Sequence, residues 1–477
     1  MGYQYPNNTY GNQIEIDHQN NIIVAGYFGP YQSNGVFVHK YDGAGKLIWT
    51  TNIANAFGNR IAVTGNGKII MSTMETPGYF ITVFDVNGAQ LRRKSIFPNS
   101  NEQRTIIAIA PAENEGYHLC GSFSGKITIG TLQVTAPNPG VHFYLAKFDS
   151  LDKCLWAVTS TSGTVGSSGP KLLVDSTGIY FGGTYSKVLG FGTNSIQSET
   201  VNGCLIKFDV SGHFKWLRNI GDGKNDSEVK SFSKDPSGNI YATGFTQQND
   251  YQCGVLPYSV YLVKLDSSGI CQWSKSMSST KWCAAGAVDA LSGNVYLTGA
   301  FQGNCIYEKG NLIGNNEPFV ARYGYDGSLC WMTGCGSYTQ TFGSSYDIRF
   351  SKGQVLLTGV LTGTMSFGGK ILNNEGAGMF LVGMSNAPGV GLKELNAGDM
   401  LKVYPSPAHG ELMIDSHGEE IRIIRIMGVD GRTFQPEITT DLNSRIIHVN
   451  IASVPEGIYV IETQSEQKCL RQKVVIE

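Results

Sequence analysis

A thirteen-residue segment recurs along most of this chain and constrains its fold more than any other feature. One copy is YLVKLDSSGICQW at 261–273. Each copy runs apolar residues into Lys or Arg and an aromatic residue or Leu, then a polar turn, then Trp. The other copies that end in Trp are FVHKYDGAGKLIW (37–49), YLAKFDSLDKCLW (144–156), CLIKFDVSGHFKW (204–216) and FVARYGYDGSLCW (319–331). An internal period of this length is typical of repeat architectures.

Two further segments precede each copy. The nearer one is a turn followed by apolar alternation and a small residue, as in GNIYATGF (238–245) and GNVYLTGAF (293–301), with counterparts at 20–28, 177–185 and 353–361 and a looser one at 115–123. The farther one is a short apolar strand, at 14–17, 61–65, 106–110, 171–175, 285–289 and 346–350. One unit therefore reads as strand, tight turn, strand, longer loop, strand, tight turn and Trp-bearing strand.

The spacing sets the number of units. From residue 156 to residue 331 the Trp positions are 60, 57 and 58 residues apart, and the first step, from 49 to 156, is 107, or two units. The missing copy is ITVFDVNGAQLRR (81–93), with Arg92 at the Trp position, and a seventh copy (379–389) stops before its fourth strand. This pattern predicts an all-β chain whose residues 1–388 form a β-propeller of about seven blades. GYQY near the N-terminus would supply the missing outer strand and close the ring.

The repeated segment itself is interpreted as a blade closure. Asp and Gly in YDGAG, FDVSG and LDSSG suit a hairpin turn, and the Trp would fill the space between neighbouring blades. The alternative makes the Asp residues metal ligands or the Trp residues a sugar platform. Equivalent positions around a ring point outward at separate places, so they would not converge on one ligand.

The residues from 14 to about 388 resemble the bacterial β-propeller repeat proteins of the SBBP type. Units of that family carry a GNxYxTGxF strand followed by an FxxKxDxxGxxxW hairpin. The second and the terminal units of this chain depart from that pattern.

The repeat pattern ends at about residue 388, and a different pattern follows. A Gly/Pro/Asn-rich linker spans 389–400, and 401–477 holds alternating strands separated by turns, which predicts a small Ig-like β-sandwich. This segment resembles the type A C-terminal sorting domain of type IX secretion cargo in Bacteroidetes, with an ordinary Ig-like accessory domain as the alternative. The residues that carry the resemblance are Tyr404, Pro405, Pro407, Gly410, Gly431, Arg432, Gly457, Tyr459 and Lys473. Ser406 departs from the Asn that most members have.

The resemblance implies a route and a partner. The type IX translocon and sorting machinery would read the tail, after passage through the inner membrane on a signal peptide. The protein would then be secreted or attached to the outer-membrane surface. The N-terminal MGYQYPNNTYGNQ does not read as a signal peptide, so the chain is either cytosolic or shown without its leader.

Bulk composition excludes some partners. The net charge is −2 and charged residues make up 16%, so nothing indicates binding to nucleic acid. No apolar run is long enough to span a bilayer. The ten cysteines show no C-x-x-C pair, which leaves disulfides and buried free thiols as open alternatives.

Motifs for catalysis are missing from the sequence. It contains no H-E-x-x-H, no phosphate-binding loop and no G-x-S-x-G, and its histidines are scattered. The loop GDGKNDSE (221–228) offers oxygens for calcium, but Lys224 occupies a position that should be a ligand. A solvated loop is the preferred interpretation, so we predict no metal and no cofactor.

A ligand would meet the long loops at one face of the ring. Loops on a rigid scaffold commonly carry binding groups. The candidates on this face are Arg60, Arg104, Asp222, Asp226, Lys281, Trp282 and Tyr338. Trp282 and Tyr338 break the repeat pattern and suit stacking on a sugar, and the alternative is local packing.

We therefore predict a secreted or surface-attached propeller that binds a glycan or a protein without catalysis. One alternative is an enzyme that acts on polysaccharide, as a glycosidase or lyase, with two carboxylates converging at the centre. Its candidates on inner strands are Glu15, Asp17, Asp175, Asp235, Asp289 and Asp347, most of them at strand ends that lead into tight turns. Asp347 is the exception, because it does not lie at a strand end that leads into a tight turn, and it is the acid to check for catalysis. A structural surface component is the third alternative.

Overall fold

The computed structural model divides the chain into two compact units, residues 1–386 and 387–477, and each is described by itself. The structure describes residues 2–4, 8–29, 35–75, 78–97, 104–166, 171–247, 249–251, 254–256, 259–336, 342–367, 370–385, 402–415, 423–428, 433–434, 436–440, 446–464 and 469–477. Nearly all of these residues lie in strands and the turns between them, with a 3-10 turn at Glu113–Glu115. In these ranges no helix has the length and apolar character needed to cross a membrane.

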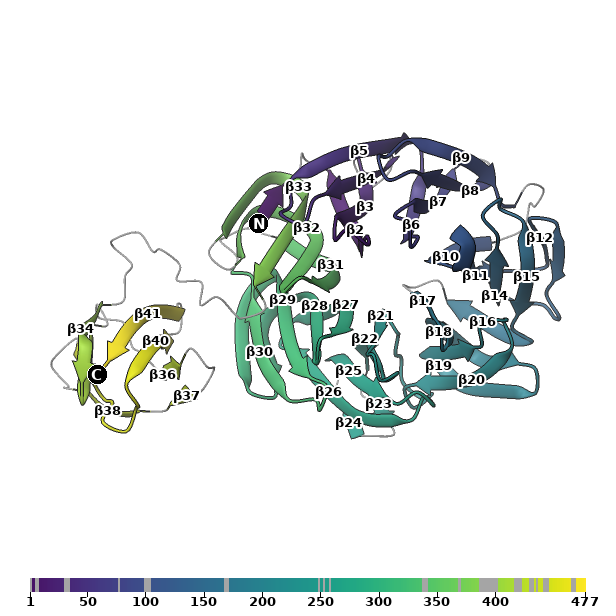
Figure 1. Cartoon of the computed structure of the whole chain (residues 1–477). Coiled ribbons are helices and arrows are strands. Elements are labelled where there is room, and N and C mark those ends of the chain that lie inside the picture. Colours follow the sequence, from purple (N-terminus) through teal and green to yellow (C-terminus); the bar gives the residue numbers. More distant parts are fainter. Residues whose placement is uncertain are drawn as a thin grey trace. The chain divides into compact units, whose positions relative to one another are not determined.

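The first compact unit is a β-propeller, in which antiparallel sheets surround a common centre (Figure 1). We number its repeat units one to seven along the chain. The first two are β2–β5 (Thr9–Ile16, Ile22–Phe28, Gly35–Tyr41, Leu47–Ala54) and β6–β9 (Phe57–Val63, Ile69–Glu75, Gly78–Phe84, Gln90–Ser95). The third is β10, β11, β14 and β15 (Arg104–Pro111, Tyr117–Phe123, His142–Phe148, Cys154–Thr159).

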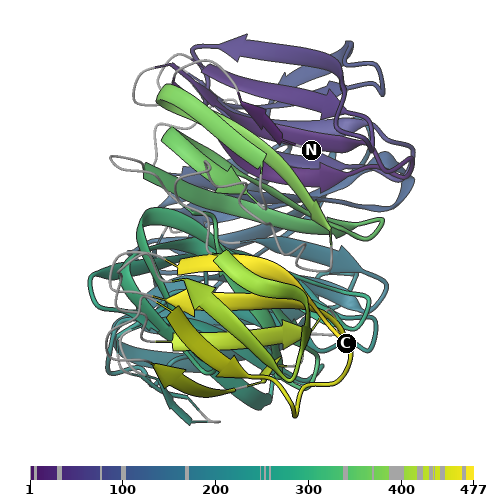
Figure 2. The same ribbon diagram turned by 90° about the vertical axis from the view of Figure 1, so that its left-hand side faces the viewer.

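The remaining units follow the same strand order. The fourth is β16–β20 (Ser162–Gly166, Leu172–Asp175, Gly178–Phe191, Asn194–Phe208, Phe214–Ile220), and the fifth is β21, β22, β25 and β26 (Ser231–Lys234, Ile240–Thr246, Ser259–Leu265, Cys271–Ser279). The sixth is β27–β30 (Trp282–Leu291, Asn294–Tyr307, Gly310–Gly324, Leu329–Gly334), and the seventh is β31–β33 (Phe342–Ser351, Gln354–Phe367, Lys370–Ser385) with β1 (Gly2–Gln4). Seen from the side in Figure 2, many of the strands run along the axis of the ring.

Strands from the two ends of the propeller meet in the seventh sheet. β1 pairs antiparallel with β33, with Tyr3 opposite Leu381. Ile14 and Phe37 of the first repeat unit share an apolar cluster with Leu356 and Met379 of the seventh. The first and seventh units are therefore joined by packing as well as by strand pairing.

The predicted longer loops are in large part ordered hairpins. β18 and β19, β28 and β29, and β32 and β33 continue past their sheets as paired strands. The third and fifth units add the separate hairpins β12–β13 (Lys126–Ile129, Leu132–Thr135) and β23–β24 (Asn249–Tyr251, Gly254–Leu256). Backbone pairing satisfies their N–H and C=O groups above the sheets, which the sequence pattern did not indicate.

The small residue at the end of the second strand is a glycine for a steric reason. A Cβ placed on Gly121 would lie 1.9 Å from the carbonyl oxygen of Thr105, and one on Gly299 would lie 2.1 Å from that of Ala284. The same close approach to an inner-strand carbonyl occurs at Gly26 and Gly359, and at Gly244 the carbonyl is that of Glu228, which precedes β21. Because no side chain fits at such distances, glycine lets the inner strand pack against the second strand.

The recurrent Trp joins one repeat unit to the next, as predicted. Trp49 Nε1 donates to the carbonyl oxygen of Val86 at 3.0 Å, in the turn of the second unit. Trp216 and Trp273 donate in the same way to Ser267 and Tyr325, both at 3.3 Å. The rings of Trp49 and Trp273 lie against the glycines of these turns: a Cβ on Gly88 would be 2.7 Å from Trp49, and one on Gly327 would be 3.0 Å from Trp273.

The second unit replaces this contact by an ion pair. Arg92 at the Trp position donates to Asp152 through Nε at 2.8 Å and Nη2 at 3.0 Å. Asp152 holds the turn position that is glycine in the other copies, and its φ of 61° is in the left-handed region. A bidentate Arg–carboxylate pair thus takes the place of a ring packed on glycine.

Two buried histidines make the stability of the propeller depend on pH. Burial lowers the pKa of His39 and of His118 to about 4, whereas an unfolded histidine titrates near 6.5. Between pH 6.5 and pH 5 the unfolded chain therefore binds more protons than the folded chain. We expect the free energy of unfolding to be constant above about pH 7 and to fall below it, by on the order of 1–2 kcal/mol per histidine at pH 5.

Urea unfolding at a series of pH values measures this dependence. All six Trp residues lie before residue 386, so their fluorescence reports on the propeller alone. The variant His118→Leu should show a shallower decline than the parent chain between pH 7 and pH 5. An identical decline in both chains would show that His118 does not contribute.

The second compact unit contains two four-stranded sheets. Their orders are β37–β36–β40–β41 (Thr433–Phe434, Ile423–Gly428, Gly457–Gln464, Cys469–Ile476) and β34–β35–β39–β38 (Lys402–His409, Glu411–Asp415, Ile446–Asn450, Glu437–Thr440). A parallel contact between Ala408 and Ile476 joins them. Leu412, Val449 and Ile461 are among the side chains that form the buried core.

Candidate functional site

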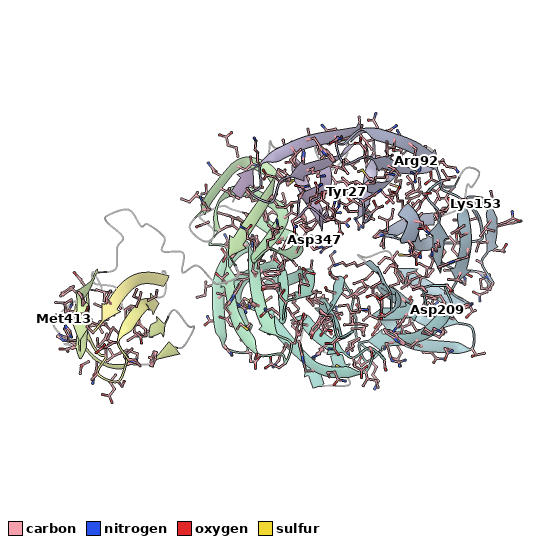
Figure 3. All side chains as sticks on the ribbon, in the orientation of Figure 1. Tyr27, Arg92, Lys153, Asp209, Asp347 and Met413 are labelled. Atoms are coloured by element: carbon pink, nitrogen blue, oxygen red, sulfur yellow. The ribbon has the colours of Figure 1, made fainter. Side chains whose placement is uncertain are left out.

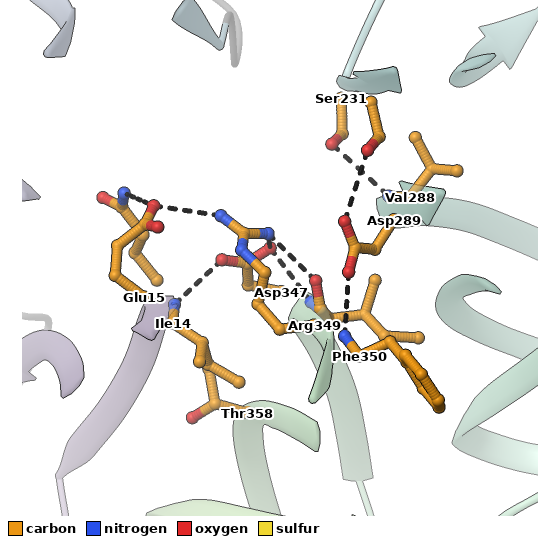
Figure 4. A network of polar contacts seen from close by, with 12 residues as sticks. Ile14, Glu15, Ser231, Val288, Asp289, Asp347, Arg349, Phe350 and Thr358 are labelled. Carbon is orange, nitrogen blue, oxygen red and sulfur yellow. Dashed lines mark hydrogen bonds and ion pairs between the residues drawn. The ribbon is translucent and has the colours of Figure 1, made fainter. Parts of the chain in front are cut away.

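The inner strands bring charged side chains together near the centre of the propeller (Figure 4). Arg349 of β31 donates to Asp347 Oδ1 at 2.9 Å and to Glu15 Oε1 of β2 at 3.0 Å. Asp347 Oδ2 accepts from the backbone N–H of Ile14 at 2.8 Å. Gln13 donates to Glu15 Oε1 at 2.9 Å. This network links the seventh repeat unit to the first, and Figure 3 shows Asp347 on the inner side of the ring.

Other inner-strand side chains form the same kind of link. Asp289 of β27 accepts from the backbone N–H of Phe350 at 2.8 Å and from Ser233 Oγ at 3.2 Å. Ser231 Oγ accepts from the N–H of Val288 at 3.3 Å. The inner strand is an edge of its sheet, so its outward N–H groups have no ladder partner. Side chains of the adjacent unit satisfy these groups, and the carboxylates therefore serve the architecture.

The remaining candidate carboxylates hold tight turns, as expected. Asp17 accepts from the N–H groups of Gln19 and Asn21 at 2.9 and 2.8 Å, and it pairs with Lys40 at 3.0 Å. Burial alone raises the pKa of Asp17, but the bonds from Asn21 and Lys40 outweigh it and the pKa lies below its usual value. Asp175 and Asp235 accept backbone N–H groups of their own turns.

The loop 221–228 is held by its own hydrogen bonds. Asp222 Oδ1 accepts from the N–H of Lys224 at 2.8 Å and from that of Asn225 at 3.1 Å. Asp226 Oδ1 accepts from the N–H of Val201 at 3.2 Å. No group of three or more His, Cys, Asp or Glu suited to a metal occurs among the described residues. The carboxylate oxygens of Asp222 and Asp226, which the sequence offered as ligand-binding groups, thus hold the loop in place through its backbone N–H groups and that of Val201.

Arg60, Arg104 and Trp282, three further predicted ligand-binding residues, lie in inner strands of the propeller. Arg60 lies in β6 opposite Ser72, and Arg104 is the first residue of β10. Trp282 is the first residue of β27; its ring is half-buried and its Nε1 donates to Asn316 Oδ1 at 3.1 Å. Tyr338 lies outside the described residues. Arg60, Arg104 and Trp282 come from the second, third and sixth repeat units, so they do not share one loop.

Sequence reasoning missed Arg349 and Lys171 at the centre. Lys171 directly precedes β17 and interacts electrostatically with Arg349, Asp347, Asp289 and Glu15. Burial is the main reason that the pKa of Lys171 lies below its usual value.

The cysteines fall into two groups. Cys271 forms a disulfide. Free thiols in the described part of the chain are Cys120, Cys154, Cys204, Cys283, Cys305, Cys330 and Cys335. All of these except Cys330 are buried, so both alternatives left open by the sequence occur in this protein.

Several residues of the expected sorting signal have defined structural roles. Tyr404 and Pro405 are joined by a cis peptide bond, and Gly410 has a φ of 68° in the turn after β34. Tyr459 is buried against Phe434, with the ring centroids 5.8 Å apart. Lys473 pairs with Val460 in β41, and Pro407 is exposed in β34. Gly457 begins β40, whereas Gly431 and Arg432 lie outside the described residues.

Known proteins resemble this chain over parts of its length. An uncharacterized WD repeat-containing protein of Acanthamoeba polyphaga mimivirus is 25% identical over 202 residues, which cover 35% of this chain and 14% of that protein. The chain thus spans about a seventh of the length of that relative. A polysaccharide lyase crystal structure has a TM-score of 0.45 at 10% identity and covers 79% of this chain and 90% of its own. The β-propeller domain of the Trilobed protease from Pyrococcus furiosus has a TM-score of 0.42 at 9% identity, with 77% and 96% covered.

The tail has a family match of its own. Residues 402–477 match the model of the secretion system C-terminal sorting domain. This match supports the predicted type IX sorting domain and, with it, a secreted or surface-attached destination. The chain therefore carries a β-propeller followed by a C-terminal sorting domain for secretion.

Proposed function

We propose that this protein is a secreted or surface-attached binding module whose propeller holds a glycan or protein ligand without catalysis. The propeller would have seven blades and would be closed by the N-terminal strand. Its blades would be SBBP-type repeats, and the protein would come from a member of the Bacteroidetes. The pairing of β1 with β33 supports the closure. The sorting tail and the disulfide at Cys271 agree with export, because disulfides persist in oxidising compartments.

This proposal depends on one observation: the carboxylates near the centre bond to neighbouring repeat units. Glycosidases need two carboxyl groups that are free to exchange protons or attack the sugar. Here Asp347 accepts from Ile14 and Arg349, and Asp289 accepts from Phe350 and Ser233. Both acids are committed to holding neighbouring repeat units together. A ligand could bind without free carboxyl groups at the end of the ring where the hairpins β18–β19, β28–β29 and β32–β33 extend past their sheets.

Trp282 offers the ligand an aromatic surface at that end. Its Nε1 bond to Asn316 fixes the ring, and the half-buried position leaves part of it accessible. Sugars stack on the faces of such rings, because C–H groups meet the negative π surface. A fixed ring loses little conformational freedom on binding, which favours affinity.

A glycan array with the full chain tests the proposal. We expect binding to at least one glycan and a loss of about 10-fold or more in affinity for Trp282→Ala, since aromatic contacts in binding sites contribute about 1–3 kcal/mol. Tyr338→Ala should act in the same direction if its loop takes part. Leu151→Ala, an exposed change in a tight turn at the other end of the ring, is the control.

The outcomes separate the alternatives. A blank array followed by capture of a defined surface protein would favour the protein ligand. Polysaccharide breakdown that disappears in Asp347→Asn would overturn the non-catalytic assignment. If Trp282→Ala lowers stability but leaves glycan affinity unchanged, Trp282 only packs locally.

A further inference from the structure

Trp282 and Phe342 occupy the same position in neighbouring repeat units. Trp282 begins β27 of the sixth unit opposite Gln302, and Phe342 begins β31 of the seventh unit opposite Thr362. Three residues later, each inner strand reaches the residue that pairs with the glycine of the second strand, and the same register shift follows. Because side chains alternate along a strand, equal register places the two aromatic rings on equivalent faces of their sheets.

The two strands that carry these residues lie beside each other (Figure 1). A Cβ on Gly286 of β27 would lie 2.2 Å from the carbonyl oxygen of Ser345 in β31. Farther along both strands, Asp289 accepts from the N–H of Phe350 at 2.8 Å. The contacts advance in the same order along β27 and β31, so the two strands run in the same direction and begin at the same end of the ring.

A short segment of β29 links the two aromatic positions. Trp282 Nε1 donates to Asn316 Oδ1 at 3.1 Å. Two residues later, Pro318 approaches the seventh unit, where its Cδ would lie 3.0 Å from a Cβ on Gly343. Gly343 directly follows Phe342. The contacts therefore run from Trp282 through β29 to the residue beside Phe342.

Both aromatic side chains offer accessible surface. Phe342 is 42% exposed, which is unusual for so large an apolar side chain, and Trp282 is half-buried. Stacking on a sugar needs an accessible ring face and no enclosed cavity. Sequence reasoning selected Trp282 but not Phe342, because the shared register of the two strands is visible only in the structure.

The polar side chains opposite these rings, or bonded to them, are uncharged. Gln302 lies opposite Trp282 and donates to Asn315 Oδ1 at 3.2 Å, and Asn316 holds the indole. Thr362 lies opposite Phe342. Amides and hydroxyls both donate and accept hydrogen bonds, as sugar hydroxyls do. These groups suit a neutral sugar, whereas an acidic one would need a cation.

We propose that Trp282 and Phe342 are two stacking platforms that bind two residues of one neutral oligosaccharide. This inference rests on the glycan-binding function proposed above, names the class of glycan and adds Phe342 as a binding residue. Two contacts made by one chain reinforce each other, because the second forms without a further loss of translational freedom. Affinity should therefore depend on the length of the oligosaccharide.

Isothermal titration calorimetry of the full chain tests the glycan class and the length dependence. The neutral ligands are cellotetraose, laminaritetraose, xylotetraose and mannotetraose, and tetragalacturonate is the acidic ligand. We expect one neutral tetrasaccharide to bind at least about 10-fold more tightly than its own monosaccharide and than tetragalacturonate. Exposed Lys281, next to Trp282, is the cation that an acidic sugar would use, so Lys281→Met should leave the affinity unchanged.

Matched variants test the role of Phe342. Phe342→Ala should lower the affinity for the neutral tetrasaccharide by about 10-fold or more, and Phe342→Tyr, which keeps the ring, should retain most of it. Leu155→Ala, at a side chain that is 48% exposed in the third unit, should match the parent chain. The urea midpoint of Phe342→Ala should stay near that of the parent chain, which separates lost binding from lost structure.

The outcomes distinguish this inference from the proposed function. Neutral glycan binding that Trp282→Ala weakens but Phe342→Ala leaves unchanged would overturn the second platform and leave the proposed function intact. Tighter binding of tetragalacturonate that depends on Lys281 would overturn the neutral class in the same way. If no oligosaccharide binds here or on the array, both the inference and the glycan-binding function are wrong.

Discussion

Replacing Gly244 by alanine is expected to lower the free energy of unfolding of the propeller by about 3 kcal/mol or more. A Cβ at this position would lie 1.9 Å from the carbonyl oxygen of Glu228 and 3.0 Å from the hydroxyl of Tyr261. That hydroxyl donates to the same carbonyl at 2.6 Å. The methyl group would therefore push Glu228, in the segment that leads into β21, away from β22 and break this bond. The clash is with backbone, which has no rotamer that relieves it.

Gly78→Ala is the matched control for this substitution. Gly78 begins β8, and the nearest atom to a Cβ there is Ser95 Oγ at 3.9 Å, which is ordinary contact. Urea unfolding followed by Trp fluorescence should place the control close to the parent chain and Gly244→Ala far below it. Similar midpoints for the two variants would show that the segment around Glu228 shifts at no cost in the free energy of unfolding.

The second large effect is expected for Arg349→Met. The side chain of Arg349 is 12% exposed and that of Asp347 is 9% exposed, so the pair is largely shielded from water. Removal of the cation leaves Asp347 and Glu15 close together without neutralisation. Breaking a buried pair in this way costs about 3–5 kcal/mol. Because the network joins the seventh unit to the first, the loss should also loosen the junction between the two ends of the propeller.

An exposed ion pair provides the control for Arg349. Lys215 contacts Asp209 at 3.0 Å on the outer rim, where the lysine side chain is 49% exposed. Solvent screens such pairs strongly, so Lys215→Met should leave the urea midpoint unchanged. If Arg349→Met behaves like Lys215→Met, the central network does not stabilise the fold.

The repeat allowed much of the fold to be predicted because its signals are local. A hairpin turn needs Asp and Gly at fixed offsets, and the strands need alternating or continuous apolar residues. The pairing of strands and the contact of each Trp with the next unit followed from this pattern. In the sequence, Arg92 is a departure from the Trp of the other copies. In the structure it bonds to Asp152, which occupies the turn position of the next unit where the other copies have glycine. The two substitutions compensate each other across sixty residues, a relation that only packing reveals.

The candidate site was predicted less well. The acids Asp17, Asp175 and Asp235 were correctly placed at turns, since a turn is a local structure. Asp347 was singled out as a catalytic candidate, whereas its oxygens hold Ile14 and Arg349. Arg349 and Lys171 were overlooked because their neighbours belong to strands far apart in the sequence. For the loop residues Asp222 and Asp226, the structure supplies a role in ordering the loop itself.

The sequence by itself determined what depends on short-range chemistry: the strand and turn order, the glycine at each tight turn, the Trp at each closure and the motifs of the sorting tail. Only the tertiary structure decided which charges meet. Packing of the first unit against the seventh brings Glu15 next to Arg349, 334 residues later. Electrostatic and hydrogen-bond energies fall steeply with distance, so they are fixed by the spatial arrangement of the strands and cannot be read from positions along the chain.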